Sequence, residues 1–233
     1  MTADKKARLA FLGCGGFCTA SILPGVARSG IIDIVAMCDI DRERAEDRAR
    51  RFGGRRVYTD YEEMLDKEQV DGVFVIGPAP QQYELAPKVL ERGIPVYVEK
   101  PSANTSAQAV EMARIAEKHG TWGQVGFMKR FCEAYTIGKE IINCAEFGSI
   151  ATVHIKFGQG DYPQIWGIDS ARRAFLIGQC VHIFDLARFF GGEVEAVYSL
   201  YTERTETQFA YLINVEFANG VIGQINITGL ESS

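Results

Sequence analysis

The chain has 233 residues, of which 47% are hydrophobic and 24% are charged, and its formal net charge is −5. This length and composition fit a globular protein with a substantial core, built as one large domain or two small ones. Positive and negative charges are interspersed along the chain, which argues against nucleic acid or an anionic membrane surface as a partner.

Cysteine usage and hydropathy bear on the cellular compartment. The six cysteines, at positions 14, 18, 38, 132, 144 and 180, show no paired CxxC spacing. The absence of such pairs argues against a zinc site and against a disulfide framework, so we expect no metal. The N-terminus lacks an apolar signal segment, and we expect no run of membrane-spanning length. A cytoplasmic location is the resulting expectation.

The first half of the chain alternates short apolar runs with segments of helical periodicity. Continuously apolar strands are buried on both faces, as in a doubly wound parallel sheet, so this half is expected to be a Rossmann-like α/β unit. Glycines at 30, 53, 93 and 120 stand where helix C-terminal caps belong, and Pro24 is expected to reshape the first helix. The expected strands are 7–12, 32–38, 72–76, 95–98 and 122–125, and the expected helices are 15–29, 41–52, 82–92 and 105–119.

The second half has a different pattern, typical of an α+β domain with helices on one face of a mainly antiparallel open sheet. We therefore expect a nucleotide-binding domain over 1–122 and a substrate-binding and oligomerisation domain over 123–233. The last strand stops shortly before Ser233, so its sheet needs a partner subunit or further chain to cover it. Helices are expected at 131–145 and 178–190, and antiparallel strands at 151–158, 196–202, 208–217 and 221–228, with a hairpin turn at 218–220.

A glycine-rich turn joins the first strand to the first helix. Gly13 and Gly15 match the first two glycines of the G-x-G-x-x-G/A pattern, and Cys18 occupies the third position. In that pattern a dinucleotide pyrophosphate lies on the helix N-terminus, where glycines allow close approach of backbone N–H groups. A tight strand-to-helix turn without a ligand is the alternative for this segment alone.

Asp39 ends the second strand, 23 residues after Gly16. That spacing matches the acidic residue that accepts the adenosine-ribose hydroxyls in dinucleotide-binding folds. A carboxylate there repels a 2′-phosphate, so NAD is favoured over NADP, although Arg42 and Arg44 lie close enough in sequence to weaken the preference. The alternative role for Asp39 is a negative charge at a helix N-terminus.

The short apolar strand at 95–98 ends in Glu99, Lys100 and Pro101. Ligands bind beyond the carboxyl ends of strands in an open parallel sheet, so Lys100 is expected to face a ligand. Pro101 favours an extended conformation at Lys100 and keeps it from starting the next helix. Alone, this triplet favours a strand end with a surface ion pair; together with the glycine turn, Asp39 and the helix segment from Gln179 to Asp185, it indicates an active site.

These motifs resemble the glucose-fructose oxidoreductase, inositol dehydrogenase and MocA (Gfo/Idh/MocA) family, and the resemblance extends over nearly the whole chain. It implies a nicotinamide-dependent oxidoreductase, most members of which act on sugars, cyclitols and related polyols, in a chain with a shortened C-terminal domain. A homo-oligomer formed through the C-terminal sheet is implied as well. Further matching stretches are Gly126–Phe131, Glu146–Ile150 and Gln179–Leu186.

The resemblance also implies roles for particular residues. Lys100 and His182 match the lysine and histidine beside the reacting hydroxyl; we assign His182 as the proton acceptor and Lys100 as the cation that stabilises the oxygen, with the reverse order open. Asp185, three residues after His182, can orient the imidazole or bind backbone. Many family members carry a carboxylate four residues before this histidine, where the chain has Gly178.

Two further sets of residues are expected at the site. The cofactor-binding set is Gly13, Cys14, Gly15, Gly16, Phe17, Asp39, Ile76, Pro78, Glu99 and Lys100. The substrate set is Lys129, Arg130, Trp166, Arg172 and Gln179, with Tyr162 and Arg173 as further candidates.

Two other functions use the same motifs. One is a lyase or glycosidase that retains its NAD and oxidises the substrate transiently. The other is a non-catalytic dinucleotide or sugar sensor, which the glycine at 178 and the early end of the last sheet would fit.

Overall fold

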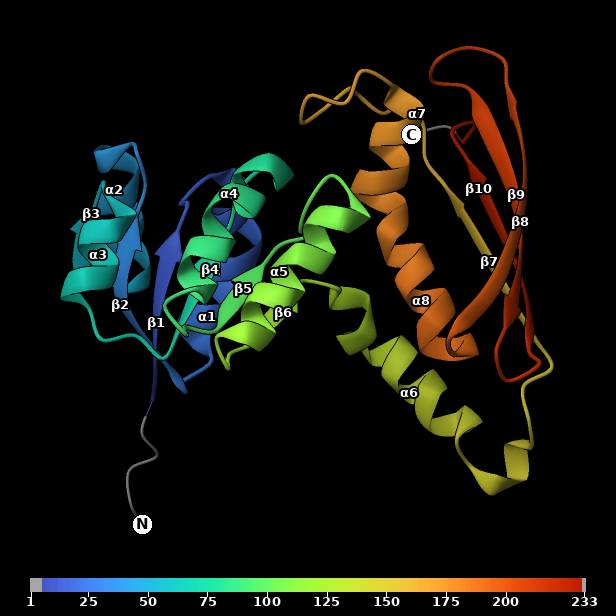
Figure 1. Cartoon of the computed structure of the whole chain (residues 1–233), viewed down its shortest axis with the longest axis horizontal. Helices are drawn as coiled ribbons and strands as arrows, with labels where there is room; N and C mark the ends of the chain where they lie inside the picture. The colour runs from blue at the N-terminus through green and yellow to red at the C-terminus, as the bar shows by residue number, and fades with distance from the viewer. Residues whose placement is uncertain (1–5, 232–233) are drawn as a thin grey trace. The chain divides into compact units, whose positions relative to one another are not determined.

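The computed structural model describes residues 6–231, so the first five residues of the expected N-terminal domain and the last two of the C-terminal one lie outside it. The chain divides into two compact units, one ending at Gly126 and the other beginning at Phe127. Figure 1 shows the parallel sheet with its helices in the first unit and the second sheet with its long helix in the other.

The first unit is a six-stranded sheet in the order β3-β2-β1-β4-β5-β6, and every pairing in it is parallel. The chain builds β1, β2 and β3 outward in one direction and then returns to place β4 on the other side of β1. This reversal creates a crevice at the carboxyl ends of β1 and β4, where such folds bind ligands. The strands are β1 (Ala7–Leu12), β2 (Ile32–Cys38), β3 (Arg56–Tyr58), β4 (Gly72–Val75), β5 (Val96–Val98) and β6 (Gly123–Val125).

Helices cover both faces of this sheet, and each face has its own apolar core. One core gathers Phe11, Leu23 and Met37 with α1 and α2, and the other gathers Val75, Met64 and Met112 with α3, α4 and α5. Burial on both faces explains why the strands are continuously apolar. The helices are α1 (Leu23–Arg28), α2 (Arg42–Phe52), α3 (Tyr61–Lys67), α4 (Ala79–Leu90) and α5 (Ser106–Lys118).

Local signals account for most helix ends in this unit. Asp41 caps α2 by accepting from the N–H of Arg44, and Thr105 and Gln108 form a reciprocal capping box at α5. The glycines expected at the ends of helices, at 30, 53, 93 and 120, all have positive φ. The first expected helix is divided: a π-helical turn over Cys18–Ile22 precedes α1, in which Pro24 occupies the first turn.

The second unit is a four-stranded sheet in the order β7-β10-β9-β8. One expectation for it was wrong: β7 pairs parallel with β10, although β10, β9 and β8 are mutually antiparallel. Gly220, with φ of 85°, completes the expected turn between β9 and β10. The elements are α6 (Glu133–Ile142), β7 (Thr152–Gly158), α7 (Ala171–Phe175), α8 (Val181–Gly191), β8 (Val194–Glu203), β9 (Phe209–Phe217) and β10 (Ile222–Thr228).

One long helical stretch packs on this sheet. A π-helical turn over Leu176–Cys180 joins α7 to α8, so the helix begins seven residues before the expected Gly178. Its buried side, including Phe175 and Ile183, contacts the sheet residues Phe209 and Ile227 in one core. By length and by a mean hydropathy of 1.3, the helical stretch 171–191 could also cross a membrane, contrary to the expectation that no such run exists. Half of its apolar part is buried inside the protein, as in the core helix of a globular protein.

Candidate functional site

The carboxyl edge of the parallel sheet holds a cleft of about 430 Å³. Its walls come from the segments that follow β1, β2, β3 and β4, which places it at the reversal of strand order. A second cleft of about 470 Å³ lies between α4, α5, β5 and β6 and is lined mostly by apolar side chains. The first has the polar groups that a dinucleotide needs; its lining includes Gly13, Gly15, Asp39, Ile40, Arg44, Thr59, Ile76, Gly77, Pro78 and Gln81.

The glycine turn is built for close approach. Gly13 has φ of 90°, and a Cβ there would collide with the carbonyl oxygen of Ile76, so only glycine fits. At Gly15 and Gly16 a Cβ would meet no atom within 4 Å, so these glycines border open space where a ligand can approach the backbone. Phe17 is half exposed beside them.

The two cysteines of this turn are buried packing residues in the structure. Cys14 and Cys18 lie in the core with Phe11 and Leu23. Burial raises the pKa of both thiols, that of Cys18 to about 12, so both stay protonated near neutral pH.

Asp39 joins the glycine turn to the start of α2. One carboxylate oxygen accepts from the backbone N–H of Cys14 at 2.8 Å, and the other accepts from the N–H of Asp41 at 3.0 Å and from Arg44 at 3.1 Å. Arg44 thus lies in the cleft, whereas Arg42 pairs with Glu46 on the surface of α2. A ribose that bonded Asp39 would compete with Arg44 for the same carboxylate.

The Glu99-Lys100-Pro101 segment is held by a buried amide that sequence analysis did not assign. Gln82, 1% exposed on α4, accepts from the N–H of Glu99 at 2.6 Å and donates to the carbonyls of Glu99 and Pro101, each at 3.0 Å. The amide oxygen and the amide nitrogen of Gln82 therefore both hydrogen-bond backbone groups of the residues that flank Lys100. The Lys100–Pro101 peptide bond is cis.

Glu99 points inward rather than forming a surface ion pair. The residue is 8% exposed, and its carboxylate accepts from the hydroxyl of Tyr97 at 2.6 Å and from the N–H of Lys100 at 3.1 Å. A Cβ at Gly126 would lie 2.7 Å from this carboxylate, so glycine is needed there. Glu99 thus supports the loop from within instead of facing the cleft.

Lys100 itself is half-buried. Desolvation lowers the pKa of its ammonium below the usual lysine value, against the opposing attraction of Glu99. A lysine with a lowered pKa at the carboxyl edge of a parallel sheet is the type of residue found at active sites.

In the second unit, His182 lies in the first turn of α8 and is 5% exposed. Its ring meets Phe127 edge to face, with the centroids 6.3 Å apart. The carboxylate of Asp185 is directed elsewhere: its two oxygens accept from Nε of Arg130 at 2.9 and 2.7 Å. Asp185 therefore ties α8 to the segment after Phe127, a contact that sequence analysis did not anticipate.

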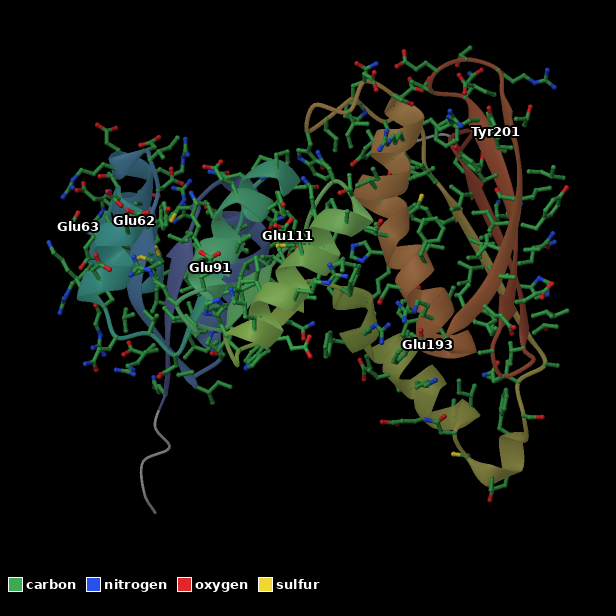
Figure 2. All side chains as sticks on the ribbon, viewed as in Figure 1. Glu62, Glu63, Glu91, Glu111, Glu193 and Tyr201 are labelled. Carbon is green, nitrogen blue, oxygen red and sulfur yellow. The ribbon has the colours of Figure 1, made fainter. Side chains whose placement is uncertain are left out.

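The expected substrate residues separate into two groups. Arg130 is paired with Asp185, Lys129 lies over the ring of Tyr135 at 6.0 Å, and Arg172 donates to the hydroxyl of Tyr211 at 2.7 Å. These cations are engaged within their own unit. Arg172 also lies 4.6 Å from the ring centroid of Tyr201, which is labelled on the sheet in Figure 2.

The other group lies around the π-helical turn. Trp166 and Tyr162 both lie against Gly178, where a Cβ would come within 3.3 Å of the Trp166 ring and would collide with the Tyr162 hydroxyl. Gln179 is the next residue of the same π-helical turn. Tyr83 donates its hydroxyl to Glu111 on α5, which is labelled in Figure 2, and is not among the residues that line the cleft. Within residues 6–231, no group of three or more histidine, cysteine, aspartate or glutamate side chains is placed to hold a metal ion.

One site residue had a detectable sequence signal. Gln82 follows Ala79 by three residues and precedes Ala86 by four, so it interrupts the apolar stripe of its helix with a polar side chain. Such a buried amide needs partners, which are the main-chain groups around Lys100. Ile40, 86% exposed beside Asp39, had no comparable signal.

Comparison with known proteins identifies the class of protein. Residues 7–127 match the model of an oxidoreductase family with an NAD-binding Rossmann fold, and residues 136–232 match the GFO/IDH/MocA C-terminal domain. The chain belongs to this family of oxidoreductases, as its motifs indicated, and its first unit has the NAD-binding fold.

Similar proteins include the inositol 2-dehydrogenase of Acidothermus cellulolyticus, which is 30% identical over 84% of this chain. The chain spans only 57% of that enzyme's length. A dehydrogenase from Chromobacterium violaceum has the same fold, with a TM-score of 0.90 and 25% identity over 98% of this chain and 67% of its own. The WlbA dehydrogenase of Chromobacterium violaceum, solved with NADH and UDP-GlcNAcA, has a TM-score of 0.80 and 23% identity over 99% of this chain and 69% of its own.

Proposed function

We propose that this chain carries out NAD-dependent hydride transfer at a CH–OH group of a sugar-like or cyclitol-like substrate. The observation that carries the proposal is Lys100: a half-buried lysine with a lowered pKa, in a loop that Gln82 holds on both sides. Relatives of the chain that are named inositol 2-dehydrogenases support the proposed class of substrate.

The cleft residues support a preference for NAD. The glycine turn can receive the pyrophosphate, and the buried carboxylate of Asp39 can accept from a ribose hydroxyl. Gly13, Gly15, Asp39, Ile76 and Pro78 of the expected cofactor set line the cleft. Bound NAD would supply the hydride acceptor at its nicotinamide ring.

The chain's own residues supply proton transfer and charge stabilisation in this proposal. His182 accepts the proton of the substrate hydroxyl, because a neutral imidazole has one ring nitrogen that can accept a proton. Lys100 stabilises the negative charge that develops on the same oxygen. The domain assignment follows: 1–122 binds the dinucleotide and 123–233 binds the polyol.

The test is a titration of the purified chain with NAD, NADP and a panel of sugars and cyclitols, followed by absorbance of the reduced nicotinamide. Sustained NADH formation supports the dehydrogenase. Substrate conversion without net NADH would instead indicate the lyase or glycosidase, and cofactor binding without conversion of any polyol would indicate the sensor.

We also propose that the chain forms a homo-oligomer through its C-terminal sheet. Tyr198, Leu200, Leu212 and Ile222 are each between 48% and 62% exposed, and they lie on the sheet face opposite the buried Ile213 and Ile225. An apolar face of this kind favours burial against a second copy. Light scattering of the wild type and of Leu200→Lys tests the oligomer: a monomeric wild type contradicts it.

We also propose a cytoplasmic location, which fits the six free thiols of the chain.

A further inference from the structure

Gly178 leaves a space on the helix one turn before His182, and a tyrosine from a distant loop fills it. A Cβ at position 178 would collide with the hydroxyl oxygen of Tyr162 and would lie 3.3 Å from the indole ring of Trp166. Both aromatic residues come from the connection between β7 and α7. The absence of a side chain at 178 is therefore what admits the phenol.

Contacts on its other sides fix the position of Tyr162. Its ring meets Phe175 edge to face, with the centroids 5.4 Å apart, and packs against the core cluster that also contains Ile183. Tyr162 is partly buried, and its ring packs against the core of the second unit. Burial raises the pKa of the phenol above its usual value, which keeps it protonated and able to donate near neutral pH.

The local helix geometry brings this phenol to the same surface as His182. Positions 178 and 182 are separated by about one helical turn, and residues at that spacing share a face. The π-helical turn over Leu176–Cys180 widens the helix at this point. Single π-helical turns of this kind frequently occur at functional sites.

We propose that Tyr162 is a substrate-binding residue whose hydroxyl hydrogen-bonds a polyol hydroxyl next to the reacting carbon, with the indole of Trp166 covering the C–H face of the ring. This inference rests on the proposed function and adds a recognition residue to it. A phenol donates and accepts one hydrogen bond at a fixed place, and an aromatic face excludes water from the ligand. The pair thus recognises a cyclic polyol.

The first experiment compares Tyr162→Phe with the wild type on the best polyol of the panel. The variant keeps the ring that packs on Phe175 and removes only the oxygen. We expect kcat/KM to fall roughly five- to tenfold or more, mainly through KM, with the Kd for NAD unchanged. Tyr83→Phe is the matched control, since Tyr83 loses only a hydrogen bond to Glu111 on the surface. Equal kcat/KM for Tyr162→Phe and the wild type would overturn the inference.

The second experiment measures polyol binding without turnover. Of the two tryptophans, Trp122 is exposed on the first unit, so Trp122→Phe leaves Trp166 as the only tryptophan, whose emission can be excited selectively over that of the tyrosines. We expect the emission to change as polyol is added in the presence of NAD, and Tyr162→Phe in this background to weaken the apparent affinity severalfold. An unchanged affinity overturns the inference.

The two proposals fail in different ways. If the emission of Trp166 responds to polyol, Tyr162→Phe weakens that response and no NADH forms, the proposed function fails and Tyr162 remains a recognition residue. If NADH forms at equal rates with and without the Tyr162 hydroxyl, the proposed function stands and Tyr162 only packs. Gly178→Ala provides a separate check, because its Cβ displaces the phenol and is expected to reproduce the Tyr162→Phe defect.

Discussion

Gln82 bonds both backbone groups of Glu99: its amide oxygen accepts from the N–H at 2.6 Å and its amide nitrogen donates to the carbonyl at 3.0 Å. The same nitrogen donates to the carbonyl of Pro101. A single side chain from α4 therefore determines the path of the loop that carries Lys100, in the way that a positioning residue supports a catalytic group.

Replacing Gln82 by leucine should leave three main-chain groups without this partner in a buried place. We expect the free energy of unfolding to fall by about 2 to 4 kcal/mol and turnover to fall further than stability alone explains, because Lys100 loses its position. Chemical denaturation and steady-state kinetics measure the two effects. Gln69→Leu, at an exposed position, is the control and should change neither. Normal kinetics in Gln82→Leu would show that the loop holds its shape without the amide.

Lys100→Met should nearly abolish turnover while the Kd for NAD stays close to that of the wild type. Methionine keeps much of the length of the side chain and removes only the charge that stabilises the reacting oxygen. Isothermal titration with NAD and NADH formation with polyol provide the two readouts. Undiminished turnover would show that Lys100 takes no part in the reaction.

The same substitution should have a pH-dependent effect on stability. Burial lowers the pKa of Lys100, so the unfolded state binds more protons at this residue than the folded state in the interval between the lowered pKa and the usual value of 10.5. The cost of burying the charge is thus fully present at neutral pH and decreases as pH rises through that interval. We expect Lys100→Met to be more stable than the wild type near pH 7 and to lose this advantage toward pH 10.5, as measured by denaturation at a series of pH values. A difference that is constant with pH would contradict the desolvation of Lys100.

Asp39→Asn should shift the cofactor preference from NAD toward NADP. The amide no longer repels a 2′-phosphate, and Arg44 loses its ion pair with Asp39 while keeping the one with Asp41, so its guanidinium can also bind that phosphate. We expect the ratio of the two dissociation constants to change by roughly ten- to a hundredfold, as for a charged hydrogen bond. Asp33→Asn, which removes an ion pair between β2 and Arg55, the residue before β3, is the control. An unaltered ratio would assign Asp39 to the glycine turn alone.

Asp185→Asn distinguishes a structural from a catalytic carboxylate. Because Arg130 binds both oxygens of Asp185 and the carboxylate is only 11% exposed, we expect the free energy of unfolding to fall by about 1 to 3 kcal/mol. The exposed pair of Arg188 and Glu193 is the comparison, and Glu193→Gln should cost less than about 1 kcal/mol. A large loss of kcat in Asp185→Asn at unchanged stability would instead favour a role in proton transfer.

Sequence analysis predicted the elements whose signals are local and strong. The strands at 7–12 and 32–38 have the expected bounds, because an uninterrupted apolar run between polar segments has few other solutions. β3 and α3 were missed. Both elements are short and have few buried residues: β3 (Arg56–Tyr58) has one, and α3 (Tyr61–Lys67) has two. Neither therefore has an apolar periodicity long enough to detect in the sequence.

The sequence by itself determined the family, the glycine turn, the acid after the second strand and the lysine after the fifth, since each depends on residue type at a fixed distance from a strand end. Tertiary structure alone decided which groups those residues meet. Gln82 reaches Glu99 across 17 positions, and Arg130 reaches Asp185 across 55. Tyr162 occupies the space left by Gly178 because a loop folds back on its helix. Hydrogen bonds and packing depend on distance in space, and no local pattern along the chain encodes that distance.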